Sequence, residues 1–414
     1  MDPNLQVSRQ YEYNFGIQRE IGFQTALEVR YVGAFSNQLA RTIDYNQIDI
    51  RSNGFLADFN RALQNRAVSG NIAGNAACLA AGTCQALTVI PNLTAGGQTT
   101  VANQVTLGTP ADTALSLVQA GQTGTVRFLP NPSSGVVNLV VNAGRMRYNA
   151  LQAELRRRFA AGLYFQANYT FQKILTDVAD DGINQSRVAP YFDNQNPRLD
   201  YARASYDTAQ FFNFNGIYEL PIGKGRYFLN RGGIVDQILG GWQLTSILQI
   251  STGAPLSFLD ARGTLNRAGR SANQTANSGL TKEQIKDLIG YRNTPQGLYY
   301  IDPSVISPTT GRAANGFGST PFSGQVFFNV NPGQTGNVER LFINGPRFWN
   351  WDASIMKNFR ITETARFQFR AEAFNVTNST RFGAPSLNIN SATFGRLTSA
   401  AAPRVIQFVG RLEF

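Results

Sequence analysis

The side chains in this sequence that could do chemistry are mostly charged residues set two positions apart. They form three groups, each joining a carboxylate and a guanidinium across one intervening residue: Glu28 with Arg30, Glu154 with Arg156, and Arg370 with Glu372. Alternate residues of a β-strand lie on the same face, so each group would present its two charges side by side. Such a surface can pair with the ionic groups of another segment, or it can simply be hydrated. Nothing in the sequence selects two carboxylates for glycoside hydrolysis.

The absence of histidine removes several kinds of active site. Catalytic triads, imidazole general bases and histidine-ligated metal sites all need that side chain. Three aspartates in "TDVADDGINQ", namely Asp177, Asp180 and Asp181, could attract calcium. Their spacing is not that of an EF-hand loop and a terminal glutamate ligand is missing, so a hydrated acidic loop is the favoured interpretation. We predict no enzyme, no metal site and no cofactor.

The two cysteines, Cys78 and Cys84, lie close together in "NAACLAAGTCQ". A structural metal site normally needs four ligands, and no others are nearby. A small disulfide loop formed in an oxidising compartment is the favoured interpretation. The alternative is a loop that contains two unpaired, small apolar side chains.

The elements that must position these residues are β-strands with apolar and polar residues in alternation. In 163–172, for example, Phe165, Ala167 and Tyr169 alternate with glutamine and asparagine. The pattern predicts about nine strands of roughly ten residues, the length that crosses a bilayer when tilted. They are expected at 11–18, 23–31, 148–159, 163–172, 210–220, 241–250, 347–359, 365–374 and 404–414.

Two architectures fit strands with one apolar and one charged face. A soluble sandwich would bury the apolar face and expose the charged residues to water. A membrane barrel reverses this arrangement, with apolar residues against lipid and charged residues lining the interior. In lipid every backbone polar group must be paired, so only a closed barrel or a helix can span it, and the last strand of a barrel can pair with the first to close it.

The predicted connections are unequal in length. One set is short, at 19–22, 160–162 and 360–364, with a longer link at 221–241. The other set is long and rich in small and polar residues, with a short helix expected at 281–289; it covers 34–146, 173–208, 259–346 and 375–403. Compact soluble domains rarely contain several such loops, whereas outer-membrane barrels combine short periplasmic turns with long extracellular loops.

Composition agrees with a β-protein and argues against other classes. The 414 residues include 29 Phe and 15 Tyr, and no run of about 18 apolar residues could form a transmembrane helix. The net charge of +11 would suit nucleic acid, but the basic residues are scattered and no nucleic-acid-binding motif accompanies them. The mean hydropathy of -0.21 looks soluble, although a barrel hides its lipid-facing residues in alternation.

Four stretches together resemble the C-terminal barrel of TonB-dependent outer-membrane receptors, specifically the Oar-like group. They are "YNFGIQREIGFQTALEVRYVGAFSNQL", "YNALQAELRRRFAAGLYFQANYTFQKIL", "YELPIGKGRYF" with "GGWQLTSILQISTGAPLSF", and "WNWDASIMKNFRITETARFQFRAEAFNVTNSTRFGAP". No single motif is decisive, but their order and spacing are collectively specific. The resemblance covers most of the chain outside the long loops.

The resemblance implies a roughly 22-stranded barrel in the bacterial outer membrane, filled by an N-terminal plug and energised by TonB. It also implies that the C-terminal Phe414 is the signal by which the barrel assembly machinery recognises the chain. Besides outer-membrane lipid, an unknown ligand is the expected partner. TonB would be reached through an N-terminal region that this sequence lacks. The opening "MDPNLQVSRQ" also lacks the features of a signal peptide.

We therefore expect 1–414 to be the C-terminal part of a TonB-dependent receptor barrel. The fold class is an all-β, transmembrane antiparallel barrel, here a partial barrel of about nine to twelve strands. Its function would be energised uptake of a large or scarce ligand. Two alternatives remain: an outer-membrane adhesion or structural barrel without active transport, and a secreted soluble β-protein that binds glycans.

Overall fold

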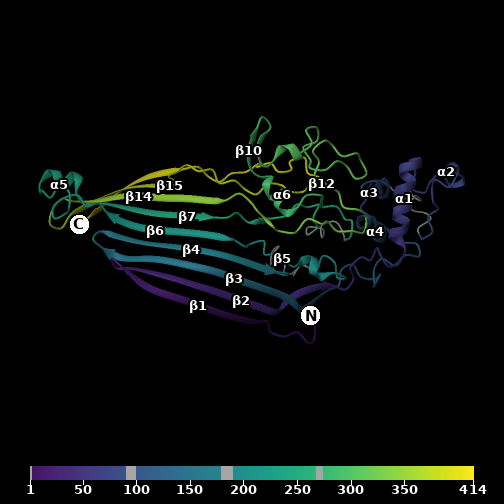
Figure 1. Ribbon diagram of the computed structural model, residues 1–414, viewed down its shortest axis with the longest axis horizontal. Helices are drawn as coiled ribbons and strands as arrows, with labels where there is room; N and C mark the ends of the chain where they lie inside the picture. Colours follow the sequence, from purple (N-terminus) through teal and green to yellow (C-terminus); the bar gives the residue numbers. More distant parts are fainter. Residues whose placement is uncertain (1, 90–98, 179–189, 267–273) are drawn as a thin grey trace.

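The computed structural model describes residues 2–89, 99–178, 190–266 and 274–414. Its main feature is one long antiparallel sheet in which nine strands follow one another in chain order (Figure 1). We call these nine strands the sheet; each of the nine predicted strands is confirmed. They are β1 (Arg9–Gly22), β2 (Thr25–Asp44), β3 (Asn138–Ala160), β4 (Leu163–Thr176), β6 (Gln210–Glu219), β7 (Trp242–Ser251), β14 (Phe348–Arg360), β15 (Arg366–Phe374) and β16 (Val405–Glu413).

The pairing register keeps the two kinds of residue on opposite faces. Phe15 lies opposite Tyr31, which lies opposite Leu151 on the next strand. One residue along β2, Arg30 lies opposite Gln152. Directly opposed residues of antiparallel strands share a face, so the alternation in each strand adds up to one apolar face and one polar face.

One end of the sheet, the short-turn end, has tight connections. Phe23 and Gln24 join β1 to β2 with φ of 49° and 57°, so the turn follows the predicted 19–22. Ala161 and Gly162 join β3 to β4, also with positive φ. This left-handed pair matches the twist of a hairpin. The link from β6 to β7 contains α5 (Ile234–Leu239), and the C-terminus lies at this end (Figure 1).

The other end, the long-connection end, holds four long segments that we call the connection layer. They are 45–137, 177–209, 252–347 and 375–404. The first contains four helices: α1 (Phe55–Ser69), α2 (Ala76–Ala80), α3 (Thr99–Thr106) and α4 (Pro110–Gln119). Helices α1, α3 and α4 pack around a core that includes the fully buried Phe55 and Phe59. The first connection therefore folds against itself.

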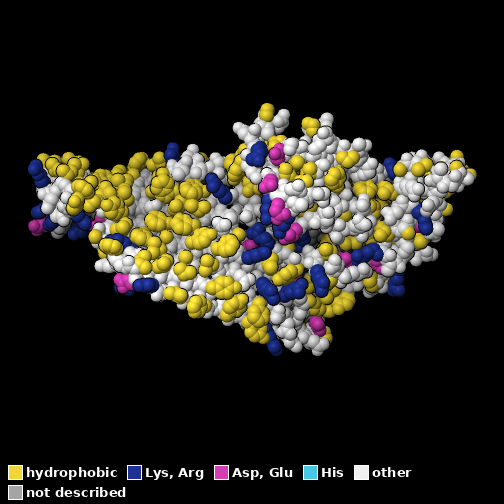
Figure 2. All heavy atoms as spheres, in the orientation of Figure 1, with side chains coloured by type: hydrophobic (Ala, Val, Ile, Leu, Met, Phe, Trp, Pro, Cys, Tyr) yellow, Lys and Arg dark blue, Asp and Glu magenta, His cyan; other side chains and the backbone are white. Residues whose placement is uncertain are grey.

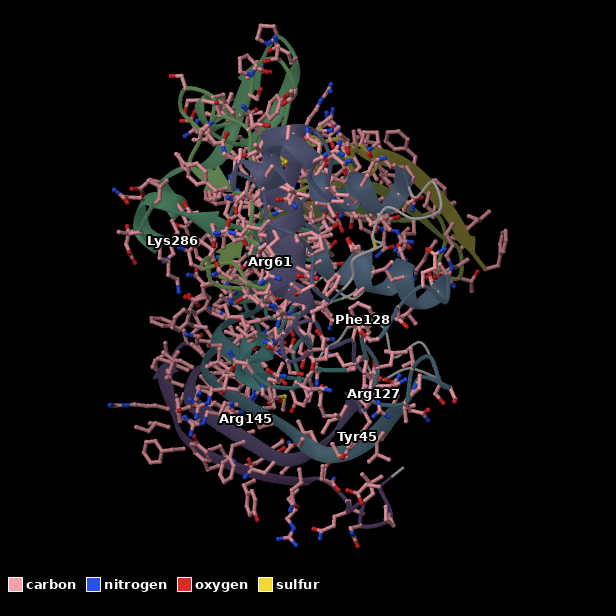
Figure 3. The ribbon with its side chains drawn as sticks, turned by 90° about the vertical axis from the view of Figure 1, so that its right-hand side faces the viewer. Tyr45, Arg61, Arg127, Phe128, Arg145 and Lys286 are labelled. Atoms are coloured by element: carbon pink, nitrogen blue, oxygen red, sulfur yellow. A yellow bond between two sulfur atoms is a disulfide. The ribbon has the colours of Figure 1, made fainter. Side chains whose placement is uncertain are left out.

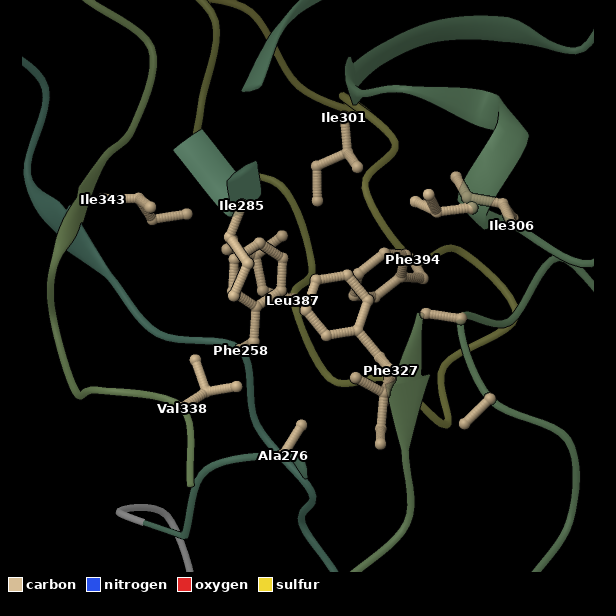
Figure 4. Packing of buried hydrophobic residues seen from close by; sticks show 14 of the residues in the cluster. Phe258, Ala276, Ile285, Ile301, Ile306, Phe327, Val338, Ile343, Leu387 and Phe394 are labelled. Carbon is tan, nitrogen blue, oxygen red and sulfur yellow. The ribbon is translucent and has the colours of Figure 1, made fainter. Parts of the chain in front are cut away.

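A second core joins two connections that are distant in the sequence. Phe258 and Phe327 stack with ring centroids 4.4 Å apart, and Phe394 from the last connection lies 6.1 Å from Phe258 (Figure 4). The predicted helix at 281–289 is confirmed as α6 (Lys282–Asp287), which begins with a capping box between Thr281 and Gln284.

The remaining elements of the connection layer are short. They are η1 (Pro197–Asp200), β5 (Ala202–Arg203), β8 (Pro255–Leu256), β9 (Asn277–Ser278), β10 (Ile289–Thr294), β11 (Gly297–Ile301), η2 (Pro303–Val305), β12 (Phe327–Phe328) and β13 (Ile343–Asn344). Among the described residues, no helix has the length and apolar character needed to cross a bilayer.

The lengths of two strands differ from the expectations, and the sheet has two open edges. Strands β2 and β3 continue into the predicted loop 34–146, pairing as far as Asp44 with Asn138. Register shifts between Ser36 and Arg41 break the alternation there, so the pattern did not predict this part. The pairing of the last strand with the first that would close a barrel is not present in the described sheet, because β1 and β16 are its two edges, as in the expected partial barrel. Closure requires strand number, tilt and stagger to match, and these nine strands form an open sheet.

Candidate functional site: the two faces of the sheet

The apolar face of the sheet is widely exposed. Phe15 is 70% exposed and Phe408 is 72% exposed, although these strands lie at opposite edges of the sheet. Figure 2 shows apolar side chains spread over the strands. Other exposed members of this face are Tyr11, Tyr13, Ile17, Leu27, Val29, Tyr31, Phe35, Leu151, Tyr169, Phe171, Tyr218, Leu244, Trp351, Ile406 and Leu412. A continuous apolar surface on this scale marks a contact with lipid or another apolar partner.

The three tryptophans lie on this apolar face, toward its two ends. Trp242 begins β7 at the short-turn end and donates its indole N–H to the Ile238 carbonyl at 3.0 Å. Trp349 lies near the long-connection end and donates to the Thr377 hydroxyl at 3.2 Å. An aromatic ring with a satisfied polar tip suits the boundary between an apolar and an aqueous layer.

Four of the six predicted charged residues meet on the polar face. Glu28 lies directly opposite Glu154 on the neighbouring strand. Arg30 lies 3.6 Å from the Glu28 carboxylate, and Arg156 lies 3.9 Å from Glu154. The Arg30 Nε also donates to the Gln152 side chain at 2.7 Å. Two like charges are thus placed side by side, each with a guanidinium next to it along its own strand.

The third predicted group also lies on the polar face, but near the β16 edge of the sheet. Arg370 and Glu372 form an ion pair of 3.1 Å on β15, and Gln407 on β16 donates to the same carboxylate. The adjacent strand contains a fourth group with the same spacing, Arg411 and Glu413, also 3.1 Å apart. Sequence reasoning did not select this fourth group, although the spacing that identified the others is present.

Uncharged side chains on the same face also form hydrogen bonds between neighbouring strands. Tyr148 donates to Gln172 at 3.1 Å, and the Gln368 amide donates to Asn358 at 3.0 Å. This face also includes four exposed apolar side chains, Phe211, Ile247, Phe374 and Val405. The polar face is thus connected by hydrogen bonds and ion pairs between its side chains. Within the described parts of the chain, no group of three potential ligand residues could hold a metal ion.

A buried ionic cluster fastens the connection layer to the sheet. Asp200 accepts Arg41 of β2 at 3.4 Å and Arg340 at 3.3 Å, and it accepts the Phe192 backbone N–H at 2.8 Å. The Arg41 side chain is fully buried and lies 4.5 Å from the ring centre of Tyr191. Burial raises the pKa of the Tyr191 hydroxyl, and the nearby Asp177 carboxylate raises it further.

Sequence reasoning missed this cluster because its members lie far apart in the chain and follow no period. Of the three aspartates considered for calcium, Asp177 instead lies 3.5 Å from Arg145. Asp180 and Asp181 lie outside the described residues. In the first connection, Cys78 and Cys84 are joined by a disulfide. Phe414 follows the end of β16 and is 92% exposed at the short-turn end.

A family model described as an outer membrane beta barrel domain matches residues 1–407. No curated protein matches the sequence. Among solved structures, the chain is similar to the outer membrane transporter YddB from Escherichia coli, with 9% identity and a TM-score of 0.39 over 99% of this chain and 33% of that one. It is also similar to the ferripyoverdine receptor of Pseudomonas aeruginosa, with 10% identity and a TM-score of 0.34 over 98% and 27%.

The chain thus spans about a third or less of the length of these two solved proteins. The family model, in contrast, covers nearly the whole chain, and its description agrees with an antiparallel sheet that exposes one apolar face. This finding overturns the alternative of a secreted soluble β-protein. The chain belongs to the outer membrane beta-barrel domain family and is a protein of the bacterial outer membrane.

Proposed function

We propose that the chain forms part of the wall of a TonB-dependent outer-membrane receptor of the Oar-like group, which takes up a large or scarce ligand. The observation that supports this most is the two-faced sheet, with lipid-compatible residues on one side and paired charges on the other. The polar face would line the interior, where its ion pairs can contact a plug or remain hydrated. No reaction is proposed, because barrels of this kind bind and conduct rather than catalyse.

The wall would be completed by further strands. Strands β1 and β16 each have only one neighbour among the described residues, so each leaves one row of backbone groups unpaired. In a bilayer such groups must find partners. We therefore propose that residues 1–414 are the C-terminal part of a larger barrel. A plug and the segment that contacts TonB would belong to other parts of that receptor.

The proposal includes an orientation. The short-turn end would face the periplasm and the connection layer the exterior, as outer-membrane barrels place their short and long connections. Phe414 would then act at the periplasmic end, where the barrel assembly machinery meets the chain. Ligand contacts would fall on the connection layer, since binding residues concentrate on loops held by a rigid scaffold.

One observation favours a second function, an adhesion or structural barrel without transport. The connection layer is folded around its own apolar cores, as a surface-displayed binding module would be. To separate the two functions, the complete gene product containing this chain would be purified in detergent and tested for binding to the periplasmic domain of TonB. Saturable binding supports the receptor. No binding by a product that reaches the outer membrane favours the second function.

The orientation of the faces has its own test, based on two adjacent residues. Phe165 lies on the apolar face and Gln166 on the polar face. An arginine facing lipid costs about 2–4 kcal/mol near the middle of the bilayer and less toward its edge, where Phe165, the third residue of β4, would lie; one facing the interior is tolerated. We expect Phe165→Arg to reduce the folded protein in the outer-membrane fraction several-fold, and Gln166→Arg to leave it nearly unchanged. Equal effects would contradict the assignment of the faces.

A further inference from the structure

A cavity of about 620 Å³ lies where the sheet meets the connection layer. Its wall includes Phe171 and Lys173 of β4, Arg203 of β5, Lys286 of α6 and Arg340. Strand β6 begins opposite Phe171, so β4 continues toward the connection layer without β6 beside it. The cavity lies in this notch.

The cavity is on the apolar side of the sheet. Phe171 and Lys173 share the face of Phe165 and Tyr169, because they are an even number of residues apart. Arg203 lies opposite Leu175, which places it on that face as well. Figure 2 shows Lys and Arg side chains gathered where the apolar strands meet the connection layer. In Figure 3, Lys286 lies at the outer flank of the connection layer.

The lining has an excess of positive charge. Five cationic side chains face two carboxylates; they are Lys173, Arg203, Lys282, Lys286 and Arg340, with Asp207 and Glu339. Buried Asp207 holds Arg203 at 2.9 Å and Glu339 holds Lys282 at 2.6 Å. Within the described residues, neither Lys173 nor Lys286 has an ion-pair partner, and both are exposed.

The cationic side chains of the cavity lie at the edge of the apolar face, toward the long-connection end. Phe171 is 52% exposed, and Lys173 lies two residues farther toward the long-connection end, a rise of about 7 Å. If the proposed orientation holds, this is the level of the headgroups of the outer leaflet, since headgroups occupy the outermost several ångströms of the bilayer. A molecule bound here could place an anionic group at Lys173 and an apolar chain over Phe171.

We propose that this cavity binds the phosphate groups of a lipid in the outer leaflet. Lysine binds phosphate as a mobile point charge and arginine as a planar donor, and the cavity offers both. Phosphate esters also occur on free sugars, so the same chemistry has two sources. The apolar residues continuous with the cavity favour the lipid. This inference rests on the proposed orientation of the chain in the membrane.

The test uses the complete gene product in phosphatidylcholine nanodiscs that contain either bisphosphorylated or dephosphorylated lipid A. We expect the bisphosphorylated form to bind at least about tenfold more tightly, and K173Q/K286Q to remove most of that preference, because the two lysines would supply charge-assisted contacts to the phosphate groups. K173R/K286R should retain it. The control K224Q/R231Q removes two charges at the short-turn end and should bind like the wild type.

Three results would overturn the inference: equal binding of the two lipids, unchanged binding by K173Q/K286Q, or equal loss in the control. Glucosamine 1-phosphate and inorganic phosphate serve as soluble competitors. If they displace the lipid at concentrations near its own dissociation constant, the source is a free phosphate and the lipid assignment is wrong. Failure of the orientation appears separately, as insertion of Phe165→Arg equal to that of Gln166→Arg.

Discussion

Several phenylalanine side chains are exposed in the sheet, and several are buried in the connection layer. Phe15 and Phe408 of the sheet are about three-quarters exposed, whereas Phe55 and Phe258 of the connection layer have no exposed surface. Neither of the two apolar cores contains a residue of the nine strands. The two regions are therefore suited to different solvents. The connection layer excludes water from its core, and the sheet needs a hydrocarbon environment for its apolar face.

Charged side chains also differ in exposure between the two regions. On the sheet, Arg370 and Glu372 are 40% and 18% exposed in their side chains. Where the connection layer meets the sheet, Asp200 and its partner Arg41 of β2 are 2% and 0% exposed. An exposed ion pair contributes roughly 0–1 kcal/mol, while removing one partner of a buried pair costs about 3–5 kcal/mol. The sheet should thus tolerate charge changes on its polar face that the connection layer does not tolerate.

The largest expected effect is in the second core. Phe258→Ala removes a fully buried ring that contacts Phe327 and Phe394, and should destabilise the connection layer by about 3–5 kcal/mol. Its matched control is Phe408→Ala on the apolar face. Hydrogen exchange in residues 252–347, measured in detergent, should accelerate strongly in the first variant only. Similar exchange in both variants would remove the distinction between the regions.

Tryptophan fluorescence gives a second measurement, which follows the sheet separately from the connection layer. All three, Trp242, Trp349 and Trp351, lie in sheet strands. Their fluorescence therefore reports unfolding of the sheet, while hydrogen exchange follows the connection layer. For Phe258→Ala the fluorescence transition should stay close to that of the wild type.

The next effect concerns the buried ionic cluster. Asp200→Asn leaves the buried Arg41 without its carboxylate and should cost about 3 kcal/mol in the connection layer. The control, Glu372→Gln on the polar face, should cost less than about 1 kcal/mol. Limited proteolysis of the detergent-solubilised protein would measure both. Equal protease resistance of the two variants would mean that Asp200 does not fasten the connection layer to the sheet.

The sheet and the connection layer also differ in how much of their structure can be predicted from the sequence. In 163–172, the alternation of Phe165, Ala167 and Tyr169 with polar residues is enough to place a strand and assign its faces, because a strand has a period of two. Phe258 and Phe394 follow no period, since their shared core is assembled from irregular segments. The cluster around Asp200 joins residues about 140 or more positions apart, and no local pattern reports such a contact.

On the polar face, the sequence predicts which residues are neighbours along one strand but not which residues pair between strands. Spacing predicted that Glu28 and Arg30 would lie side by side, and the structure places them 3.6 Å apart. It did not predict that Glu28 would lie opposite Glu154, because β2 and β3 are joined by the long connection 45–137 and no local pattern fixes the register of two such strands. The open edges at β1 and β16, in contrast, agree with the partial barrel expected from the number of strands.

The smallest effect depends on pH and is confined to the connection layer. The Ser304 backbone N–H donates to Asp302 at 2.9 Å and, with the Ser304 hydroxyl, lowers the pKa of that carboxyl below its ordinary value. A lowered folded-state pKa contributes stability that is fully present above the unfolded value and is lost as pH falls through the folded value. The turn η2 should therefore loosen only below about pH 4.

Amide exchange at Ser304 and Val305, compared between about pH 5 and about pH 2.5 after correction for intrinsic rates, would measure this loosening. Asp302→Asn retains a side-chain acceptor for the Ser304 N–H but does not titrate, so its protection should change less with pH. If the Asp302→Asn variant loses protection with pH as steeply as the wild type, another group in the connection layer controls its acid response, and the helical turn at Pro303–Val305 is not stabilised by this carboxylate.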